Sequence, residues 1–214
     1  MKRFILLMFI AIISIALVAC EGENSKDDEK AAKADEPTSS EEKKDNEKET
    51  NKDEEKSVSE GDVIENEMGK TTILNKKEDM NELVENGPMK LTITGIQNAT
   101  LEPAADYKGM FDNKDKLTVI TVGMKAENTS KETVSFYPDQ ATLTTNAGDQ
   151  VDADPLLSDE VGGDFFGPTK KEGKVIFKLD TPAEEIKDIK LVISGASNEN
   201  LDSLGEDIQL PLSF

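Results

Sequence analysis

Hydrophobic and polar residues alternate with a period of two through most of the second half of the chain. Met89, Leu91 and Ile93 alternate with polar neighbours, and Gly95 shifts the phase to Ile96, which is typical of a β-bulge. The same alternation returns at residues 120–126, 134–136, 141–143, 175–179, 189–193 and 208–214. Because successive side chains of a strand point to opposite faces, this pattern predicts short strands with one buried face.

Clusters of turn-forming residues separate these stretches, for example at 127–131 and 146–149. Short strands with one buried face, joined by such turns, favour an antiparallel sandwich. Seven or eight strands in about 130 residues is the size of one immunoglobulin-like domain. Pro211 lies on the outward side of the last stretch and indicates an edge strand. We therefore predict a mainly β chain in which residues 61–214 form an immunoglobulin-like antiparallel β-sandwich.

Two segments have helical rather than alternating spacing. Met80, Leu83 and Val84 predict one or two turns of helix, which Asn86-Gly87-Pro88 would end. In residues 101–113, aromatic and apolar side chains three and four positions apart predict a crossover helix that caps one end of the sandwich. The alternative for this second segment is a stripe of aromatic side chains that binds a ligand.

Residues 152–169 form a long predicted loop that contains Phe165 and Phe166. Loops carry binding residues more often than strands do, which makes this loop a candidate binding surface. We nevertheless expect both phenylalanine side chains to pack beneath the loop.

The first twenty residues have the organisation of a secretory signal. Two basic residues precede an apolar run from residue 4 to residue 19, which ends at Cys20, the chain's only cysteine. The order Leu17-Val18-Ala19-Cys20 resembles the lipobox of bacterial lipoproteins. The resemblance implies that the Cys20 thiol is diacylated and that cleavage between Ala19 and Cys20 removes the signal peptide, residues 1–19. An uncleaved anchoring helix is the alternative, and both interpretations export the remainder of the chain.

Residues 20–60 are rich in lysine and acidic residues and nearly free of large apolar ones. Such a segment cannot bury enough surface to offset the loss of chain entropy, so we predict a disordered spacer. A transient helix stabilised by charge pairs four residues apart is the alternative.

The overall charge excludes one class of partner. The chain has 25 basic and 45 acidic residues, and removal of residues 1–19 changes its net charge from −20 to −22. Phosphate neutralisation requires a basic surface, so we expect no nucleic-acid binding. The same charge repels an anionic membrane, which leaves the lipid on Cys20 as the predicted membrane contact.

The composition also removes several kinds of chemistry. The chain has no histidine, and its one cysteine is committed to lipid, so Ser-His-Asp and Cys-His catalysis, His/Cys zinc sites, haem ligation and disulfides are excluded. We predict no enzyme, no catalytic residue and no cofactor. An acidic segment has the oxygen ligands that calcium takes, although its spacing matches no EF-hand loop; its members are Asp149, Asp152, Asp154, Asp159, Glu160 and Asp164.

Several strand and turn motifs resemble a family of uncharacterised immunoglobulin-like domains in lipoproteins and secreted proteins of Gram-positive bacteria. The motifs are residues 119–134, 136–143, 173–177, 181–182 and 189–193. The resemblance covers about residues 60–214 and implies a fold and a surface location, without any catalytic residue. We therefore expect a lipid-anchored binding or adhesion module on the extracytoplasmic face of the cell membrane, with an extracellular protein or envelope ligand as its partner. A calcium-dependent or carboxylate-based envelope hydrolase is the alternative function.

Overall fold

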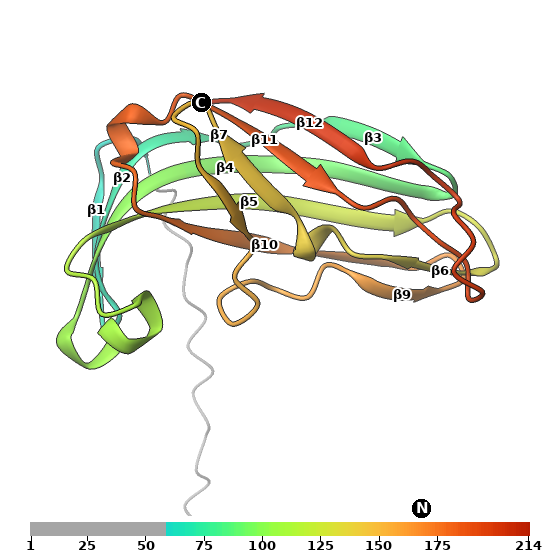
Figure 1. The fold of residues 1–214 in the computed structure, drawn as a ribbon, viewed down its shortest axis with the longest axis horizontal. Helices are drawn as coiled ribbons and strands as arrows, with labels where there is room; N and C mark the ends of the chain where they lie inside the picture. Colours follow the sequence, from blue (N-terminus) through green and yellow to red (C-terminus); the bar gives the residue numbers. More distant parts are fainter. Residues whose placement is uncertain (1–58) are drawn as a thin grey trace, which may run out of the picture. The chain divides into compact units, whose positions relative to one another are not determined.

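The computed structural model describes residues 59–214 (Figure 1). The predicted signal peptide, Ala19, Cys20 and nearly all of the predicted spacer lie outside these residues. Within the described part of the chain, no helix is long and apolar enough to cross a membrane.

One sheet contains the longest strands of the described residues. Its order is β1 (Val63–Asn66), β2 (Gly69–Lys77), β4 (Met89–Pro103), β5 (Leu117–Asn128) and β10 (Lys170–Leu179), and all neighbours are antiparallel. β3 (Glu82–Asn86) also pairs with β4. It pairs with the first residues of β4, whereas β2 pairs with the later ones. β4 and β5 therefore form the centre of the sheet (Figure 1).

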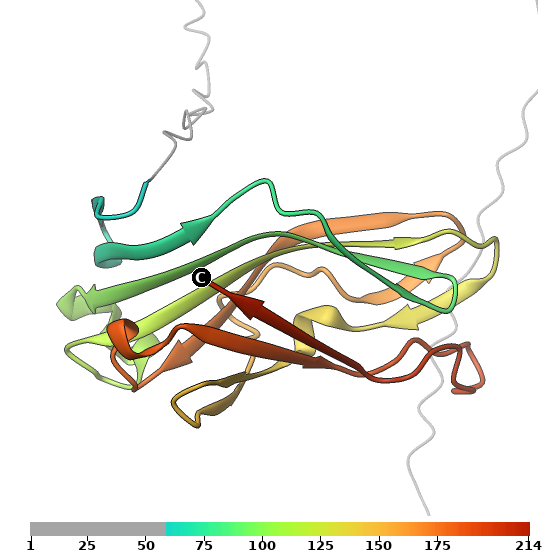
Figure 2. The same ribbon diagram turned by 90° about the horizontal axis from the view of Figure 1, so that it is seen from above.

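The second sheet lies against the first and has the order β12, β11, β7, β8 (Figures 1 and 2). Its strands are β7 (Thr142–Thr145), β8 (Gln150–Asp152), β11 (Asp188–Ile193) and β12 (Ile208–Ser213). A separate short ladder joins β6 (Thr133–Phe136) to β9 (Gly163–Phe166). Three 3₁₀ helices complete the described residues: η1 (Ala105–Phe111), η2 (Pro138–Gln140) and η3 (Ala183–Glu185).

The strand order is that of an immunoglobulin-like sandwich. In immunoglobulin terms β4, β5 and β10 correspond to strands A, B and E, which are neighbours in that order. β12, β11, β7 and β8 correspond to G, F, C and C′ of the facing sheet. The predicted mainly β, immunoglobulin-like antiparallel sandwich is therefore confirmed, with β1, β2 and β3 added beside strand A. β12 lies at an edge, as the exposed Pro211 indicated.

The predicted alternation positions the core. Val122 and Met124 are completely buried on β5, and Leu191 is completely buried on β11 across the interface between the sheets. The register of β4 against β5 shifts between Ile93 and Gly95, which confirms the predicted bulge. The shift keeps Ile96 buried on the core side.

The helix predicted at residues 80–84 is wrong, because residues 82–86 form strand β3. Gly87 and Pro88 are a two-residue loop between paired Asn86 and Met89. Gly87 has φ +57° and proline fixes a negative φ, the combination that a type II′ hairpin turn requires. The residues interpreted as a helix stop are thus a hairpin turn, and the exposed Leu83 explains how an imperfect apolar pattern imitated a helix.

The helix predicted within residues 101–113 exists as the 3₁₀ helix η1. Phe111 is buried beside Leu101 and Leu117 in a small second core, against which Tyr107 packs. The packing interpretation holds for this segment except at Met110, whose side chain is exposed.

Candidate functional site

Two inter-strand connections meet at one end of the sandwich, on the right in Figure 1, which we call the loop end. The first is the B–C connection, residues 129–141, which includes β6; the second is the F–G loop, residues 194–207, between β11 and β12. Ser135 and Ser197 join them, because each backbone N–H donates to the other's carbonyl at 2.9 and 3.0 Å. The two connections therefore form one surface. In immunoglobulin variable domains the corresponding loops belong to the antigen-binding end.

Asn198 organises the tip of the F–G loop. Its side-chain oxygen accepts hydrogen bonds from the backbone N–H groups of Asn200 and Asp202, both at 2.9 Å. Its side-chain amide donates to Asp202 Oδ2 at 3.1 Å. This network holds Leu201 at φ +64°, an uncommon conformation for a leucine, with 84% of the residue exposed. The loop thus presents a large apolar side chain to solvent from a hydrogen-bonded turn.

A hollow of about 380 Å³ lies between the B–C connection and the F–G loop. We call it the loop hollow, and it is lined by Pro88, Ser130, Glu132, Thr133, Val134, Asn198, Glu199, Asn200 and Leu204. The lining combines apolar side chains with two glutamates. It contains no lysine or arginine.

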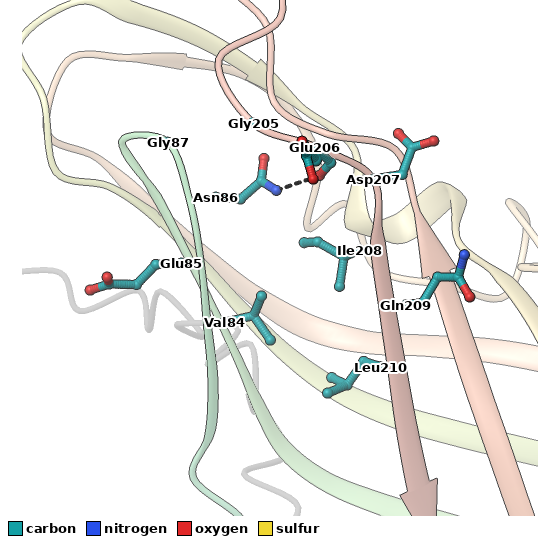
Figure 3. A pocket seen from close by; sticks show the side chains of 10 residues that line it. All are labelled: Val84, Glu85, Asn86, Gly87, Gly205, Glu206, Asp207, Ile208, Gln209 and Leu210. Atoms are coloured by element: carbon teal, nitrogen blue, oxygen red, sulfur yellow. Dashed lines mark hydrogen bonds between the residues drawn. The ribbon is translucent and has the colours of Figure 1, made fainter.

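A second hollow of about 320 Å³, the edge hollow, lies between β3 and β12 (Figure 3). Figure 3 shows Val84, Ile208 and Leu210 between the two strands, Glu206 and Asp207 toward the F–G loop, and Glu85 pointing away from the hollow. The Asn86 side-chain amide closes one end by donating to the Glu206 carbonyl at 2.7 Å (Figure 3). Its side-chain oxygen accepts from the Ala196 N–H, also at 2.7 Å. Buried Asn86 therefore ties the β3–β4 hairpin to the F–G loop.

The two hollows lie on either side of one close backbone contact. A Cβ atom at Gly87 would collide with the Leu204 carbonyl, and a Cβ at Gly205 would collide with the Asn86 side chain. Leu204 lines the loop hollow, whereas Asn86 and Gly205 line the edge hollow. The hairpin turn and the F–G loop thus form a ridge with one hollow on each side.

Phe165 and Phe166 do not share the buried environment that the sequence suggested. Strand β9 places Phe165 in the core with 1% of its surface exposed, whereas Phe166 is 72% exposed. Because adjacent residues of a strand point to opposite faces, one of the pair had to leave the core once this segment became a strand. Phe166 pairs with Thr133, which lines the loop hollow, so it adds an exposed aromatic ring to the loop end.

The acidic segment that suggested calcium is spread over separate local interactions. Asp149 accepts hydrogen bonds from Thr145 and Thr181, Asp152 from Thr142, Asp159 from the Lys174 N–H, and Asp164 from Ser135. Glu160 forms an ion pair with Lys171 at 3.1 Å. Among residues 59–214 no group of three or more acidic side chains is placed to hold a metal ion. The structure therefore does not bring the six predicted ligands together.

Asp154 is the acidic residue of this segment with a distinctly perturbed pKa. Burial raises its pKa, but hydrogen bonds from the Lys178 ammonium at 2.9 Å and from the Leu156 and Leu157 N–H groups outweigh burial. The net result is a pKa below the ordinary value of 3.8. A carboxylate held in its charged form by three donors stabilises the turn at residues 154–158 and is poorly suited to act as a general acid.

The strand order and loop placement define the class of the described residues as an immunoglobulin-like domain with a two-hollow loop end. The sequence is 32% identical over 160 residues to the SPbeta prophage-derived uncharacterized lipoprotein YonS of Bacillus subtilis strain 168, across 72% of this chain and 71% of that protein. The chain therefore belongs to the family of this bacterial lipoprotein. No protein-family profile matches it.

Among solved structures, a functionally unknown protein from Listeria monocytogenes EGD-e has a similar fold. It has a TM-score of 0.54 and 16% identity, over 68% of this chain and 88% of that protein. The yjhA protein of Bacillus subtilis gives a TM-score of 0.43 and 12% identity, over 62% and 97% of the two chains. At 16% identity the likeness to the Listeria monocytogenes protein concerns the fold alone.

Sequence reasoning missed the loop end. Residues 194–207 contain two isolated leucines, Leu201 and Leu204, among asparagine, serine, glycine and acidic residues between two predicted strands. Leucine within a stretch of turn-forming residues was the available signal for an exposed apolar loop. The hollows themselves depend on the contact of Gly87 with Leu204, which no local pattern indicates.

Proposed function

We propose that the protein is a lipid-anchored lipoprotein that presents an immunoglobulin-like binding module on a flexible spacer at the extracytoplasmic face of the cell membrane, without catalysing a reaction. Diacylation of Cys20 would supply a stable membrane tether, because two acyl chains hold a protein where one holds it only marginally. A flexible segment of about 40 residues would span roughly 35 Å.

The position at which the chain joins the sandwich carries this proposal. Gly61 donates its N–H to the Ile73 carbonyl at 2.9 Å, and Ile73 pairs with Ala99 of β4. Ala99 is ten residues from Met89, which begins β4 at the loop end, so roughly 30 Å separate the two positions at the usual rise of a strand. The loop end therefore lies at the opposite end of β4 from the position at which Gly61 contacts the sheet.

The exposed apolar side chains support a binding role for that end. Phe166 and Leu201 are more than two-thirds exposed, and they flank hollows whose lining includes further apolar residues. Apolar surface gathered around hollows is a feature of contact sites, whereas single exposed residues are ordinary. The local partners of the acidic segment favour this role over a hydrolase, which needs converging carboxylates.

The anchor is tested with the variant Cys20→Ala in the producing bacterium. We expect loss of acyl labelling and a shift of the protein from the membrane fraction to uncleaved precursor or medium. Cys20 is the only thiol in the chain, so labelling that persists would exclude the lipobox interpretation.

The binding role is tested by affinity capture from envelope extract. We expect the full chain to retain a discrete partner, and the double variant Phe166→Ser/Leu201→Ser to lose it. Leu156→Ser is the matched control, because Leu156 is as exposed as Leu201 but lies in the turn at residues 154–158. Capture that both variants retain equally would contradict the loop end as the binding surface.

A further inference from the structure

The two hollows share one sign of charge. Their linings include five acidic residues and no basic residue; the acidic residues are Glu85, Glu132, Glu199, Glu206 and Asp207, of which Glu85 points its carboxylate away from the edge hollow (Figure 3). Glu85 has Lys90 at 4.0 Å, and Asp207 accepts a hydrogen bond from the Gly195 N–H at 3.0 Å. Within the described residues the other three side chains make no ion pair or hydrogen bond, so three negative charges at the loop end lack a partner.

Acidic and apolar residues lie two positions apart in the segments of the loop end. Glu199 is two residues from Leu201, Leu204 is two residues from Glu206, and Glu132 is two residues from Val134. All except the buried Val134 are exposed. A complementary partner must therefore supply both apolar and positively charged groups at close spacing.

Four other occupants of the loop end are disfavoured by charge or by the edge of the second sheet. A second copy would bring together surfaces of one sign on chains of net charge −20, which costs association energy. Strand addition along β12 is blocked, because Pro211 lacks an N–H and the Lys77 ammonium already donates to the Ser213 carbonyl at 2.8 Å. An anionic membrane or a nucleic acid has the wrong charge.

We propose that the loop end binds an extended polypeptide segment of another extracellular protein in which lysine or arginine lies two positions from a large apolar residue, so that both side chains point to the same face. The apolar side chains of this segment pack against Leu201, Leu204 and Phe166. Its cationic side chains pair with Glu132, Glu199 and Glu206. This inference rests on the proposed binding function and specifies the chemistry of its partner.

The test uses the full acylated chain in nanodiscs of neutral phosphatidylcholine, with empty nanodiscs as blank. The probe is a fluorescein-labelled peptide in which lysine and leucine take turns at every second position with serine between them, and its counterpart has glutamate in place of each lysine. We expect saturable binding of the lysine peptide, measured by fluorescence anisotropy, and no binding of the glutamate peptide. Binding should weaken as salt rises, because exposed charge pairs are screened.

Matched variants locate the binding site. Glu132→Lys/Glu199→Lys should weaken binding of the lysine peptide roughly tenfold, since each exposed pair contributes a fraction of a kcal/mol and reversal turns attraction into repulsion. Glu102→Lys/Glu184→Lys changes the same net charge at exposed positions outside both hollows and should leave affinity within about twofold. Leu201→Ser should weaken binding and Leu156→Ser should not. Thermal melts of all variants verify that they are folded.

Two outcomes would overturn the inference. Equal loss in both charge-reversal variants would mean that net charge alone attracts the peptide. Absence of lysine-peptide binding by a chain that still captures an envelope partner through Phe166 and Leu201 would reject the cationic partner and leave the proposed function standing. Loss of that capture would instead remove the proposed function itself.

Discussion

The two ends of the sandwich treat the same kinds of residue in opposite ways. At the end that contains η1, the aromatic ring of Phe111 is buried between Leu101 and Leu117. Two acidic side chains there are paired with lysines: Asp115 with Lys108 and Asp180 with Lys114. The aromatic ring of Phe111 and these two carboxylates therefore have their partners within the domain.

At the loop end, apolar side chains are exposed and acidic side chains lack partners. Phe166 and Leu201 are exposed, and Glu199 has no partner among the described residues. An exposed leucine alone means little, since folded proteins expose much apolar surface. The contrast is informative because exposed apolar side chains, Phe166 and Leu201, and glutamates without a partner in residues 59–214 occur together at the loop end, although Phe136 and Phe165 nearby are buried. It indicates that the η1 end contributes to stability and that the loop end remains free for contact.

The largest expected effect concerns the core that both ends share. Val122→Asp would bury a carboxylate without a partner and should unfold the domain. Thr121→Asp should cost little, because its cross-strand neighbours Gln97 and Ile176 carry no carboxylate. Thermal melts of the two variants decide this. Equal losses, or a greater loss at Thr121, would contradict the assignment of Val122 to the buried face of β5 and of Thr121 to the outward face.

A pair of phenylalanine variants measures the contrast between the ends directly. Phe111→Ala should lower the free energy of unfolding by about 3–5 kcal/mol, as truncation of a buried aromatic residue does. Phe166→Ala should lower it by less than about 0.5 kcal/mol, because the ring is mostly exposed. Urea titrations give both values. A large loss at Phe166 would show that this ring supports the fold.

Asn86 links the hairpin turn to the F–G loop, and these two segments form the ridge between the hollows. Asn86→Ala should cost about 1–3 kcal/mol, because the Glu206 carbonyl and the Ala196 N–H lose their partner. Asn200→Ala removes the same side chain from an exposed position whose side chain makes no hydrogen bond within residues 59–214 and should be neutral. Urea titration checks the difference. Equal stability of the two variants would show that the Asn86 side chain does not stabilise the contact between the hairpin and the F–G loop.

The smallest expected effect is a pH dependence at Asp154. Its pKa is lowered in the folded state, so its contribution is complete above the unfolded value of 3.8 and is lost as pH falls through the lower folded value. Asp154→Asn should therefore destabilise the protein at pH 7 and lose this difference below pH 3.8. The Asp115 pKa is also lowered, by a hydrogen bond from Lys108, but Asp115 is fully exposed, so Asp115→Asn should have a smaller effect that salt abolishes. A difference at Asp154 that grows toward low pH would contradict the assignment.

The sequence predicted what depends on local periodicity. Alternation through Val122 and Met124 identified the buried face, and Gly95 identified the bulge. The strand at Leu83 and Val84 was mistaken for a helix, because its outward position holds a leucine that imitates helical spacing. Pairing with β4, a tertiary contact, overrode the local pattern.

For the candidate site, the sequence predicted the kinds of residue but not which of them lie close together. An acidic chain without histidine pointed to binding rather than catalysis, but the acidic residues that drew attention, such as Asp149 and Asp152, are bound to nearby threonines. The loop end depends on Ser135 meeting Ser197 and on Gly87 meeting Leu204, across more than 60 residues of sequence. Contacts at such separation follow from strand order, which the alternation pattern leaves open.

Site-specific photocrosslinking on intact cells shows which surface of the domain contacts a partner. A photoreactive side chain replaces Leu201 at the loop end in one strain and the equally exposed Leu156 in another. We predict a discrete adduct of the protein with a partner only from position 201, and its loss when Phe166→Ser is added. Adducts of equal yield from both positions, or an adduct from position 156 alone, would contradict the loop end as the contact surface.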